Sequence, residues 1–139
     1  MGTWIWYADQ ILRNFPEARV ICLRRPREET VKSFLAKKPN SNRWQKSEWD
    51  GDPWGETCPW YDDGLTKEEA IGAYWDGVYG EAEDLDRIWD RFLLEEMDEV
   101  LNDRAHQRQT LRALGFDRPK THVGIHKNQG TYEAKSGGH

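Results

Sequence analysis

An arginine-rich turn contains the residues of this sequence that are best suited to chemistry. Arg24, Arg25 and Arg27 directly follow a continuously apolar run, residues 20–23, and Pro26 stands among them. Such a run is typical of a strand covered on both faces in a parallel sheet, and proline suits the start of a helix, where its missing N–H costs nothing. Free N–H groups at a helix start, together with guanidinium groups, bind phosphate or sulfate. The pattern therefore indicates an anion site where a strand meets a helix.

A second interpretation of the same turn needs no ligand. Arginines at the end of a strand are often only solvated, and Glu28 and Glu29 are close enough in sequence to pair with them. Strand-to-helix junctions of α/β folds are, however, where ligands usually bind. The spacing alone leaves the two interpretations open.

The helix expected after the turn has an apolar stripe at Val31, Phe34 and Leu35, which predicts the face that packs on the sheet. On an ideal helix Ser33 lies about 200° from Val31, so its side chain points away from the core and can reach a ligand. Lys32, beside it, adds a positive charge to the same segment.

The segment FPEARVICLRRPREETVKSFL resembles the 3′-phosphate-binding segment of bacterial-type sulfotransferases that use 3′-phosphoadenosine-5′-phosphosulfate (PAPS). In that family a strand ends in Arg-x-Pro, and a serine on the following helix also binds the phosphate. The matching residues are Arg24 and Ser33, although the commonest family serine lies one position earlier, at Lys32 of this chain. The resemblance implies that Arg24 and Ser33 bind the 3′-phosphate of PAPS or of its product, adenosine 3′,5′-bisphosphate (PAP). Arg25, Arg27 and Lys32 would be neighbouring cations.

Later segments resemble the same family. DPWGETCPWYDDGLTKEEAIGAYWDGVYGEAEDL is similar to a loop and helix, and FLLEEMDEVLNDRAHQRQTLRALGF is similar to a late strand, an acidic element and a closing helix. VGIHKN is similar to a tail segment, in which His126 and Lys127 would approach the nucleotide. The resemblance implies a truncated three-layer α/β fold of the P-loop-like sulfotransferase type, with a short parallel sheet flanked by helices. Residues 1–117 would form one domain and residues 118–139 a loosely held tail.

The loop that grips the 5′-phosphosulfate in this family has no counterpart in the sequence. In the family it precedes the 3′-phosphate segment, whereas 23 residues precede Arg24 and no GxxxxGK[ST] pattern occurs. We therefore expect binding of PAPS or PAP, with sulfuryl transfer to a hydroxyl or amine only if that loop is supplied from elsewhere. No catalytic base is assigned, so whether the protein is an enzyme stays open. The alternatives are a non-catalytic nucleotide-binding relic and a module that binds a protein or glycan.

Residues 37–65 form a long Trp-rich segment that is expected to be an irregular loop. Loops of this length are usually functional or disordered, and the many aromatic residues argue against plain disorder. By resemblance, such a loop covers the acceptor, so Trp54, Trp60 and Asp62 are candidates for binding a small-molecule or carbohydrate acceptor. The alternative, which we favour for most of the tryptophans, is a hydrophobic cluster that pins the loop to the domain.

Charge and composition exclude several other classes. The first 38 residues carry a net charge of +4 and the remainder −9, so the chain totals −5. This places positive charge around the expected anion site and argues against general nucleic-acid binding. His122 and His126 lie outside any helical pattern and the two cysteines lack metal spacing, so no metal is expected. The apolar run at residues 4–8 is too short for a signal peptide or a membrane span, so we expect a cytoplasmic protein without a membrane partner.

Periodicity predicts the remaining elements. Residues 4–15 read as a helix with Ile5, Ala8, Phe15 and either Ile11 or Leu12 on its inner face. A short strand is expected at residues 92–94. A sheet this short would expose an unpaired edge, which predicts a homo-oligomer formed through that edge.

Two capping signals frame the second half of the chain. Thr66 and Glu69 form a capping box at the start of a long amphipathic helix, and Asn102 or Asp103 starts a final helix that ends at Gly115. The residues expected to face the core from the long helix are Ile71, Tyr74, Trp75, Val78, Ala82, Leu85, Ile88 and Trp89.

Overall fold

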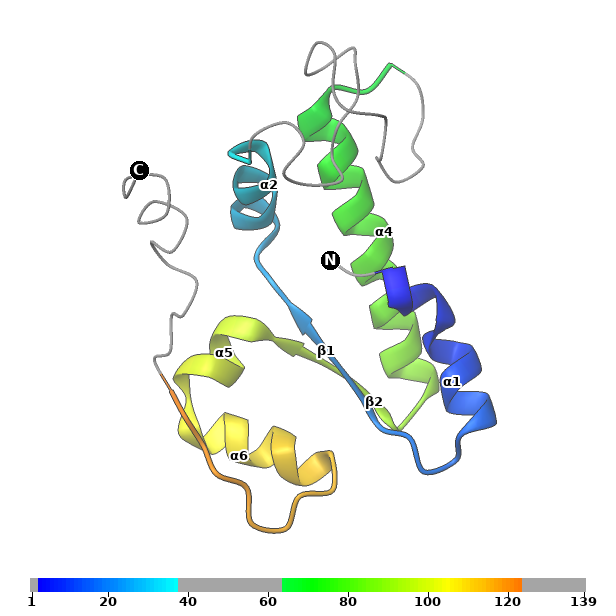
Figure 1. Ribbon diagram of the computed structural model, residues 1–139, viewed down its shortest axis with the longest axis vertical. Helices are drawn as coiled ribbons and strands as arrows, with labels where there is room; N and C mark the ends of the chain where they lie inside the picture. Colours follow the sequence, from blue (N-terminus) through cyan, green and yellow to red (C-terminus); the bar gives the residue numbers. More distant parts are fainter. Residues whose placement is uncertain (1–2, 38–63, 124–139) are drawn as a thin grey trace, which may run out of the picture. The chain divides into compact units, whose positions relative to one another are not determined.

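The computed structural model describes residues 3–37 and 64–123 of the 139-residue chain (Figure 1). The described elements are η1 (Thr3–Tyr7, a 3₁₀ helix), α1 (Ala8–Asn14), β1 (Val20–Arg24), α2 (Arg27–Leu35), α4 (Lys67–Ile88), β2 (Phe92–Glu96), α5 (Met97–Asn102) and α6 (Arg104–Ala113). The chain divides into two compact units, Met1–Leu94 and Glu95–His139, each with its own internal packing.

The first unit is built around a two-stranded parallel sheet in which β1 lies beside β2. The Val20 N–H donates to the Arg91 carbonyl at 2.8 Å and begins this pairing. Because side chains alternate along a strand, Cys22 of β1 and Phe92 of β2 both enter the core that η1, α1 and α4 share with the sheet. Helices flank the sheet, so the expected small α/β architecture is confirmed at this coarse level.

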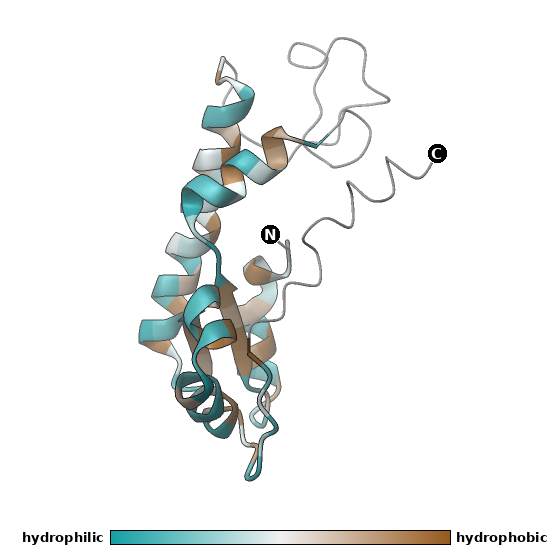
Figure 2. Cartoon of the chain, turned by 90° about the vertical axis from the view of Figure 1, so that its left-hand side faces the viewer, coloured by the Kyte–Doolittle hydropathy of each residue, from teal (hydrophilic) through white to brown (hydrophobic). Residues whose placement is uncertain are grey.

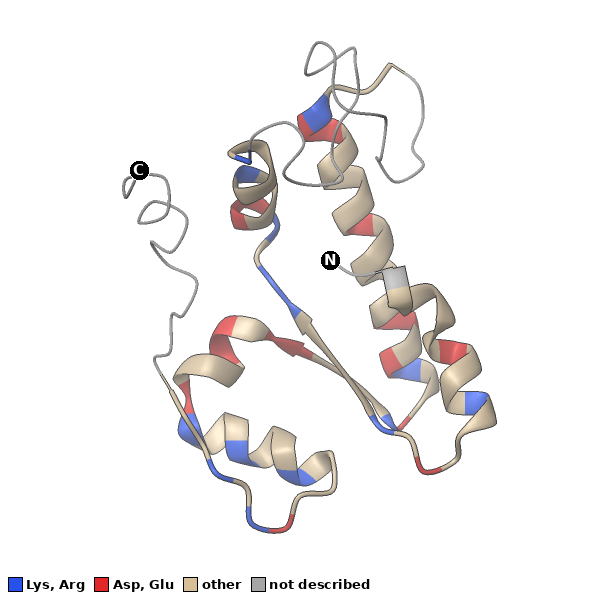
Figure 3. Ribbon diagram, viewed as in Figure 1, with Lys and Arg blue, Asp and Glu red and all other residues tan. Residues whose placement is uncertain are grey.

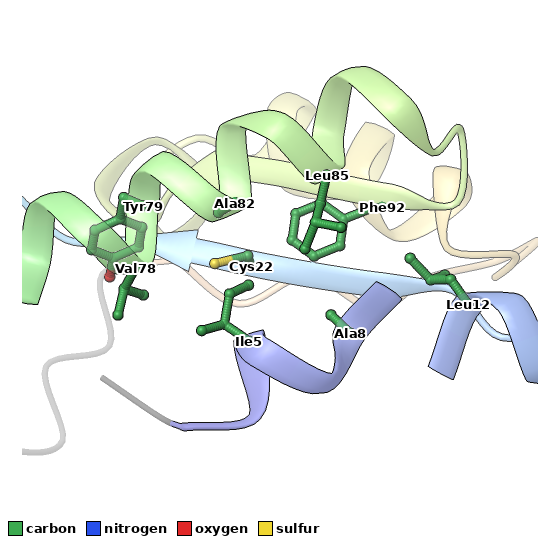
Figure 4. Close-up of a cluster of buried hydrophobic side chains, with 9 residues drawn as sticks. All are labelled: Ile5, Ala8, Leu12, Cys22, Val78, Tyr79, Ala82, Leu85 and Phe92. Atoms are coloured by element: carbon green, nitrogen blue, oxygen red, sulfur yellow. The ribbon is translucent and has the colours of Figure 1, made fainter. Parts of the chain in front are cut away.

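One hydrophobic cluster holds these elements together (Figure 4). Its buried members are Ile5, Ala8, Leu12, Cys22, Val78, Tyr79, Ala82, Leu85 and Phe92. Figure 2 shows the pattern that produces it: the strands begin with hydrophobic residues and end in charged ones, whereas the helices carry hydrophobic and hydrophilic residues throughout. A smaller cluster of Val31, Ala70 and Ile71 joins α2 to the first turns of α4. Helix α4 therefore contributes to both clusters of the unit.

Helix α4 begins where the sequence predicts. The Glu69 N–H donates to the Thr66 hydroxyl at 3.2 Å, and the Thr66 N–H donates to the Glu69 carboxylate at 2.8 Å, which completes the capping box. Most of the predicted inward residues are buried or half-buried, but Ile88 is exposed. That prediction was wrong because Ile88 is the last residue of the helix, beyond the part of α4 that packs on the sheet.

The N-terminal helical segment also differs from expectation. Ile5, Ala8 and Leu12 are buried as predicted, but Phe15 is exposed. The helix ends at Asn14, and Phe15 follows it with φ −124° and ψ 90°, so its side chain leaves the helical face that enters the core. Of the two alternatives Ile11 and Leu12, the structure buries Leu12.

Arg91 ties the end of α1 to the start of β2. Its guanidinium donates to the carbonyls of Leu12 at 2.5 Å, Phe15 at 2.9 Å and Ala18 at 2.8 Å. The same group lies 5.4 Å from the ring centre of Trp89, a geometry that favours a cation–π interaction. These bonds satisfy carbonyls at the end of α1 and in the segment that leads into β1.

In the second unit, α6 is capped as the sequence predicts. The Asp103 carboxylate accepts from the N–H groups of Ala105 at 2.9 Å and His106 at 3.2 Å. Gly115, with φ of 101°, lies just beyond the helix in the left-handed conformation that favours glycine. Sequence patterning did not separate the short helix α5 that precedes α6.

A buried glutamine organises this second unit. The Gln107 amide donates to the carbonyls of Val100 at 2.9 Å and His122 at 2.8 Å, and its oxygen accepts from the His122 N–H at 2.7 Å. One side chain thus joins α5, α6 and the segment that follows α6.

Candidate anion site at the β1–α2 turn

Aromatic side chains of α4 fix the backbone of the arginine-rich turn. The Tyr79 hydroxyl donates to the Leu23 carbonyl at 3.3 Å and accepts from the Arg25 N–H at 3.4 Å. One turn earlier on α4, the indole N–H of Trp75 donates to the Arg25 carbonyl at 3.1 Å. The two rings are 4.7 Å apart between centres and tilted by 58°. Burial raises the pKa of the Tyr79 hydroxyl, so this group stays protonated and able to donate.

Two of the three arginines pair with carboxylates of the same helix. Arg24 Nη1 lies 2.8 Å from Glu83 Oε1. Arg27 makes a bidentate contact with Asp76, at 2.9 Å from Nε and 3.0 Å from Nη2. The Arg27 guanidinium holds the pKa of Asp76 below its ordinary value and has its own pKa raised by the same bond. Figure 3 shows these acidic positions as red bands along α4 and the blue arginine segment at the end of β1.

A glycine of α4 makes room for Arg27. A Cβ at Gly72 would lie 2.5 Å from Arg27 Nη2 and 3.1 Å from its Cζ, so the guanidinium packs directly on the helix backbone at that position. Arg27 is therefore held both by an ion pair and by shape.

The ion pairs differ from those that the sequence suggested. Glu28 and Glu29 were possible partners of the arginines in the interpretation without a ligand, but the observed pairs of Arg24 and Arg27 are with Glu83 and Asp76 of α4, about 50–60 positions later. The sequence carried a signal for this arrangement, since Asp76, Tyr79 and Glu83 follow a three-and-four spacing that places them on one helix face. This spacing brings the three side chains to the turn only because α4 packs against it.

Arg25 differs from its neighbours. Its side chain is half-buried, and its Nε is shielded from solvent yet donates to no atom in the described part of the chain. Buried N–H groups of this kind are rarely left unpaired. Beside it, Pro26 precedes α2 without a side-chain cap, and the Thr30 hydroxyl donates to the Pro26 carbonyl at 2.8 Å. The turn that leads into the uncapped first turn of α2 therefore contains a guanidinium N–H that is unsatisfied among the described residues.

The structure brings the three arginines to one turn at the carboxyl end of β1, but Ser33 lies further along α2. Ser33 is six residues beyond Arg27, about 9 Å along the helix axis. Ser33 is half-buried and Lys32 is exposed. The predicted apolar face was wrong in part: Val31 is buried and Phe34 packs beside it, but against Ala70 and Ile71 of α4 and not against the sheet, and Leu35 is exposed. The remaining predicted site residues, Trp54, Trp60, Asp62, His126 and Lys127, lie outside the described residues.

A second polar pair lies in the second unit. His106 Nε2 is 2.8 Å from Glu95 Oε2, and both side chains are half-buried. This pairing was not predicted from the sequence. An acid eleven residues earlier, on a different element, is not a pattern that a sequence reveals.

Metal-binding clusters and membrane-spanning helices are both missing from the described residues. Within residues 3–37 and 64–123, no group of three or more His, Cys, Asp or Glu side chains is arranged to hold a metal ion. Among the helices described, none has the length and apolar character needed to cross a bilayer.

Comparison of the chain with protein-family models, with curated proteins and with solved structures found no match. The resemblance to sulfotransferases therefore rests on individual sequence segments alone.

Proposed function

We propose that this protein is sulfotransferase-like and binds the 3′-phosphate of PAPS or PAP at the β1–α2 turn, with Arg24 and Arg25 as its ligands; Ser33, about 9 Å further along α2, would contact another part of the nucleotide. The proposal includes the P-loop-like sulfotransferase fold, of which the two-stranded sheet and its helices would be a part. The observation that carries it is the buried Nε of Arg25, which has no partner among the described residues and belongs to the turn that directly precedes α2, a helix whose start has no side-chain cap. A phosphate oxygen at this place would accept from both the guanidinium and the helix N–H groups.

The ion pairs of the turn are compatible with such a ligand. Glu83 and Asp76 are exposed, and exposed ion pairs contribute only about 0–1 kcal/mol. A phosphate carries more charge than a carboxylate and offers more acceptor oxygens, so it can displace Glu83 from Arg24. Glu83 would then pair with the Arg24 guanidinium only while the nucleotide is absent. Arg27, fitted against Gly72, would keep its carboxylate and hold the turn in place.

Sulfuryl transfer would follow only if a further element grips the sulfuryl group. In that reaction the acceptor oxygen or nitrogen attacks sulfur in line, the bond from sulfur to the phosphate oxygen of PAPS breaks, and a base takes the acceptor proton. None of the described residues is assigned as that base. The same turn would equally serve a protein that binds the nucleotide without transferring the group, so binding is the first property to test.

Isothermal titration calorimetry with PAP tests the proposal directly. We expect binding by the wild-type chain that is lost in Arg25→Ala and weakened in Arg24→Ala. Arg108→Ala is the matched control, because Arg108 is an exposed arginine of α6 in the other unit. Equal weakening by all three variants would show only a non-specific charge effect, and no binding by the wild type would refute the proposal.

A charge-neutral variant of the competing carboxylate sharpens the test. Glu83→Gln should raise the affinity for PAP about two- to fivefold, since releasing one exposed ion pair contributes up to about 1 kcal/mol. Asp90→Asn makes the same change of net charge at the opposite end of the sheet, just before β2 begins, and should leave the affinity unchanged. A twofold loss of affinity in Glu83→Gln would mean that Glu83 supports the site instead of competing for it.

A further inference from the structure

The N-terminal helical segment carries large apolar side chains on two sides. Ile5, Ala8 and Leu12 project toward β1 and α4, as Figure 4 shows. Five other large apolar residues remain exposed, with exposed fractions of 42% for Trp4, 49% for Trp6, 60% for Tyr7, 36% for Ile11 and 63% for Phe15. These are five of the nine large hydrophobic residues that are exposed in the described part of the chain. Such clustering marks an interaction site, whereas scattered exposed residues need no explanation.

Four of these side chains follow one line along the segment. Trp4 and Tyr7 are three apart in η1, where a 3₁₀ helix places such residues directly above one another. Tyr7 and Ile11 are four apart, the spacing of neighbours on an α-helix, and Phe15 follows four residues later, just after the helix ends. We call these four residues the aromatic row. It extends about 16 Å along the surface of the first unit.

The uncovered area is suited to a small interface. Side chains of this size bury about 150–250 Å² each when fully covered, so the exposed fractions of the four residues in the row leave about 400 Å² accessible. Two such surfaces facing each other would bury about 800 Å² in total, which is below the roughly 1,000 Å² of a stable specific interface and in the range of weak, transient contacts. The area is too small for an obligate dimer and sufficient for a weak one.

The charges near the row favour a second copy of this chain over a lipid surface. The row contains no acidic or basic residue, so two copies would bring no like charges together. On α1 the single basic residue, Arg13, is paired with Asp9 at 2.6 Å. Helices that lie on anionic membranes usually present unpaired lysines or arginines beside their apolar face, and α1 presents none.

We infer that the aromatic row is the interface of a symmetric homodimer. In such a dimer the same surface serves both copies, and the two α1 helices run antiparallel across the two-fold axis. Ile11 lies near the middle of the row and is closest to that axis, while Tyr7 and Phe15 of one copy meet Phe15 and Tyr7 of the other. The dimer is concentration-dependent, with a dissociation constant of about 1–100 μM.

Sedimentation equilibrium of the full chain across about 1–500 μM tests this inference. The wild type should associate, and Phe15→Lys and Tyr7→Lys should each weaken the association at least about tenfold, because each buries a lysine in an apolar contact. Phe116→Lys is the matched control: Phe116 is 59% exposed and lies in the second unit. Far-ultraviolet circular dichroism of each variant separates lost association from lost folding, and two different positions guard against one variant failing to fold.

Three outcomes would overturn the inference. The first is a wild-type chain that stays monomeric at 500 μM, about the highest concentration of the range. The second is a dimer that neither substitution weakens, as expected if the copies instead pair through the open edge of the sheet. The third is a monomer that floats with anionic vesicles and loses this property in Tyr7→Lys. Because none of these measurements involves the nucleotide, their result is independent of the proposed function.

Discussion

Replacing Arg91 should strongly destabilise the first unit. Arg91→Met keeps an unbranched apolar side chain and removes the guanidinium together with its cation–π contact with Trp89. The carbonyls of Leu12, Phe15 and Ala18 then lose their donor. The first and last of these bonds are sheltered from water, whereas the Phe15 carbonyl is exposed and can bind solvent instead.

The magnitude follows from the two sheltered bonds. A hydrogen bond to a charged group contributes about 1.5–3 kcal/mol, so their loss should lower the free energy of unfolding by about 3 kcal/mol. That is a large fraction of the roughly 5–15 kcal/mol that is usual for a domain. With a denaturant slope of about 1–2 kcal/mol per molar urea, the midpoint of unfolding should fall by about 2 M.

Tryptophan fluorescence in urea is the appropriate assay, because all eight tryptophans of the chain precede residue 95 and so report on the first unit alone. Arg87→Met is the control: Arg87 lies in the last turn of α4 and pairs with Asp84 at the surface. It should change the free energy of unfolding by less than about 1 kcal/mol. Arg91→Lys retains the charge but not the several N–H donors of the guanidinium, so its midpoint of unfolding should lie between those of the wild type and Arg91→Met.

A midpoint for Arg91→Met that matches that of Arg87→Met would refute the reasoning. It would mean that the three carbonyls are solvated as easily as they are bonded, and that Arg91 does not fix the end of α1.

Three further predictions follow from other contacts. Gly77→Ala should stabilise α4 by about 1 kcal/mol, because nothing among the described residues lies within 4 Å of the added Cβ. Gly72→Ala should stabilise it less, because the added Cβ would displace Arg27 from Asp76. Equal increases in the free energy of unfolding, measured by urea denaturation, would show that the ion pair adds nothing. Gln107→Glu loses the two amide donor bonds and should speed hydrogen exchange of the His122 amide about tenfold, unlike the exposed control Gln109→Glu. Hydrogen bonds from Arg13 and Trp89 hold the pKa of Asp9 below its ordinary value of 3.8, so their stabilisation is complete above that pH and is lost as pH falls through the lower folded pKa. Asp9→Asn should therefore flatten the acid decline of the unfolding midpoint, and parallel profiles for wild type and variant would contradict this.

Local signals explain which elements the sequence predicted. The apolar run of β1, the capping box at Thr66 and the cap at Asp103 each depend on residues within four positions of one another. Such signals act in the same way whatever the rest of the chain does, so the boundaries that depend on them were accurate.

The partners of the arginine turn could not be predicted in the same way. Arg24 meets Glu83 and Arg27 meets Asp76 only because α4 packs across the turn, and nothing near the arginines in sequence indicates this. The prediction that Ile88 faces the core was wrong for a related reason. Its spacing continues the apolar stripe of α4, but periodicity does not show where the surface that covers the stripe ends.

The unsatisfied Arg25 Nε was also beyond the reach of the sequence. Three arginines in a turn are chemically alike until the fold gives each its neighbours. Within the described part of the chain, two of them form ion pairs with carboxylates, and the third, Arg25, has a buried N–H without an acceptor. This difference makes Arg25 the residue to test first.

The pairing of β1 with β2 has a consequence for how the chain folds. The bond from Val20 to Arg91 joins residues about 70 positions apart, so forming the sheet closes a long loop before many contacts compensate for the lost entropy. Helix α4 carries its own cap and can form locally, and the strands gain their apolar partners only once it is in place. We expect substitutions at Val20 to speed unfolding while leaving the folding rate nearly unchanged, as stopped-flow fluorescence would show. The sheet would then assemble after the rate-limiting step, against helix α4, which has already formed.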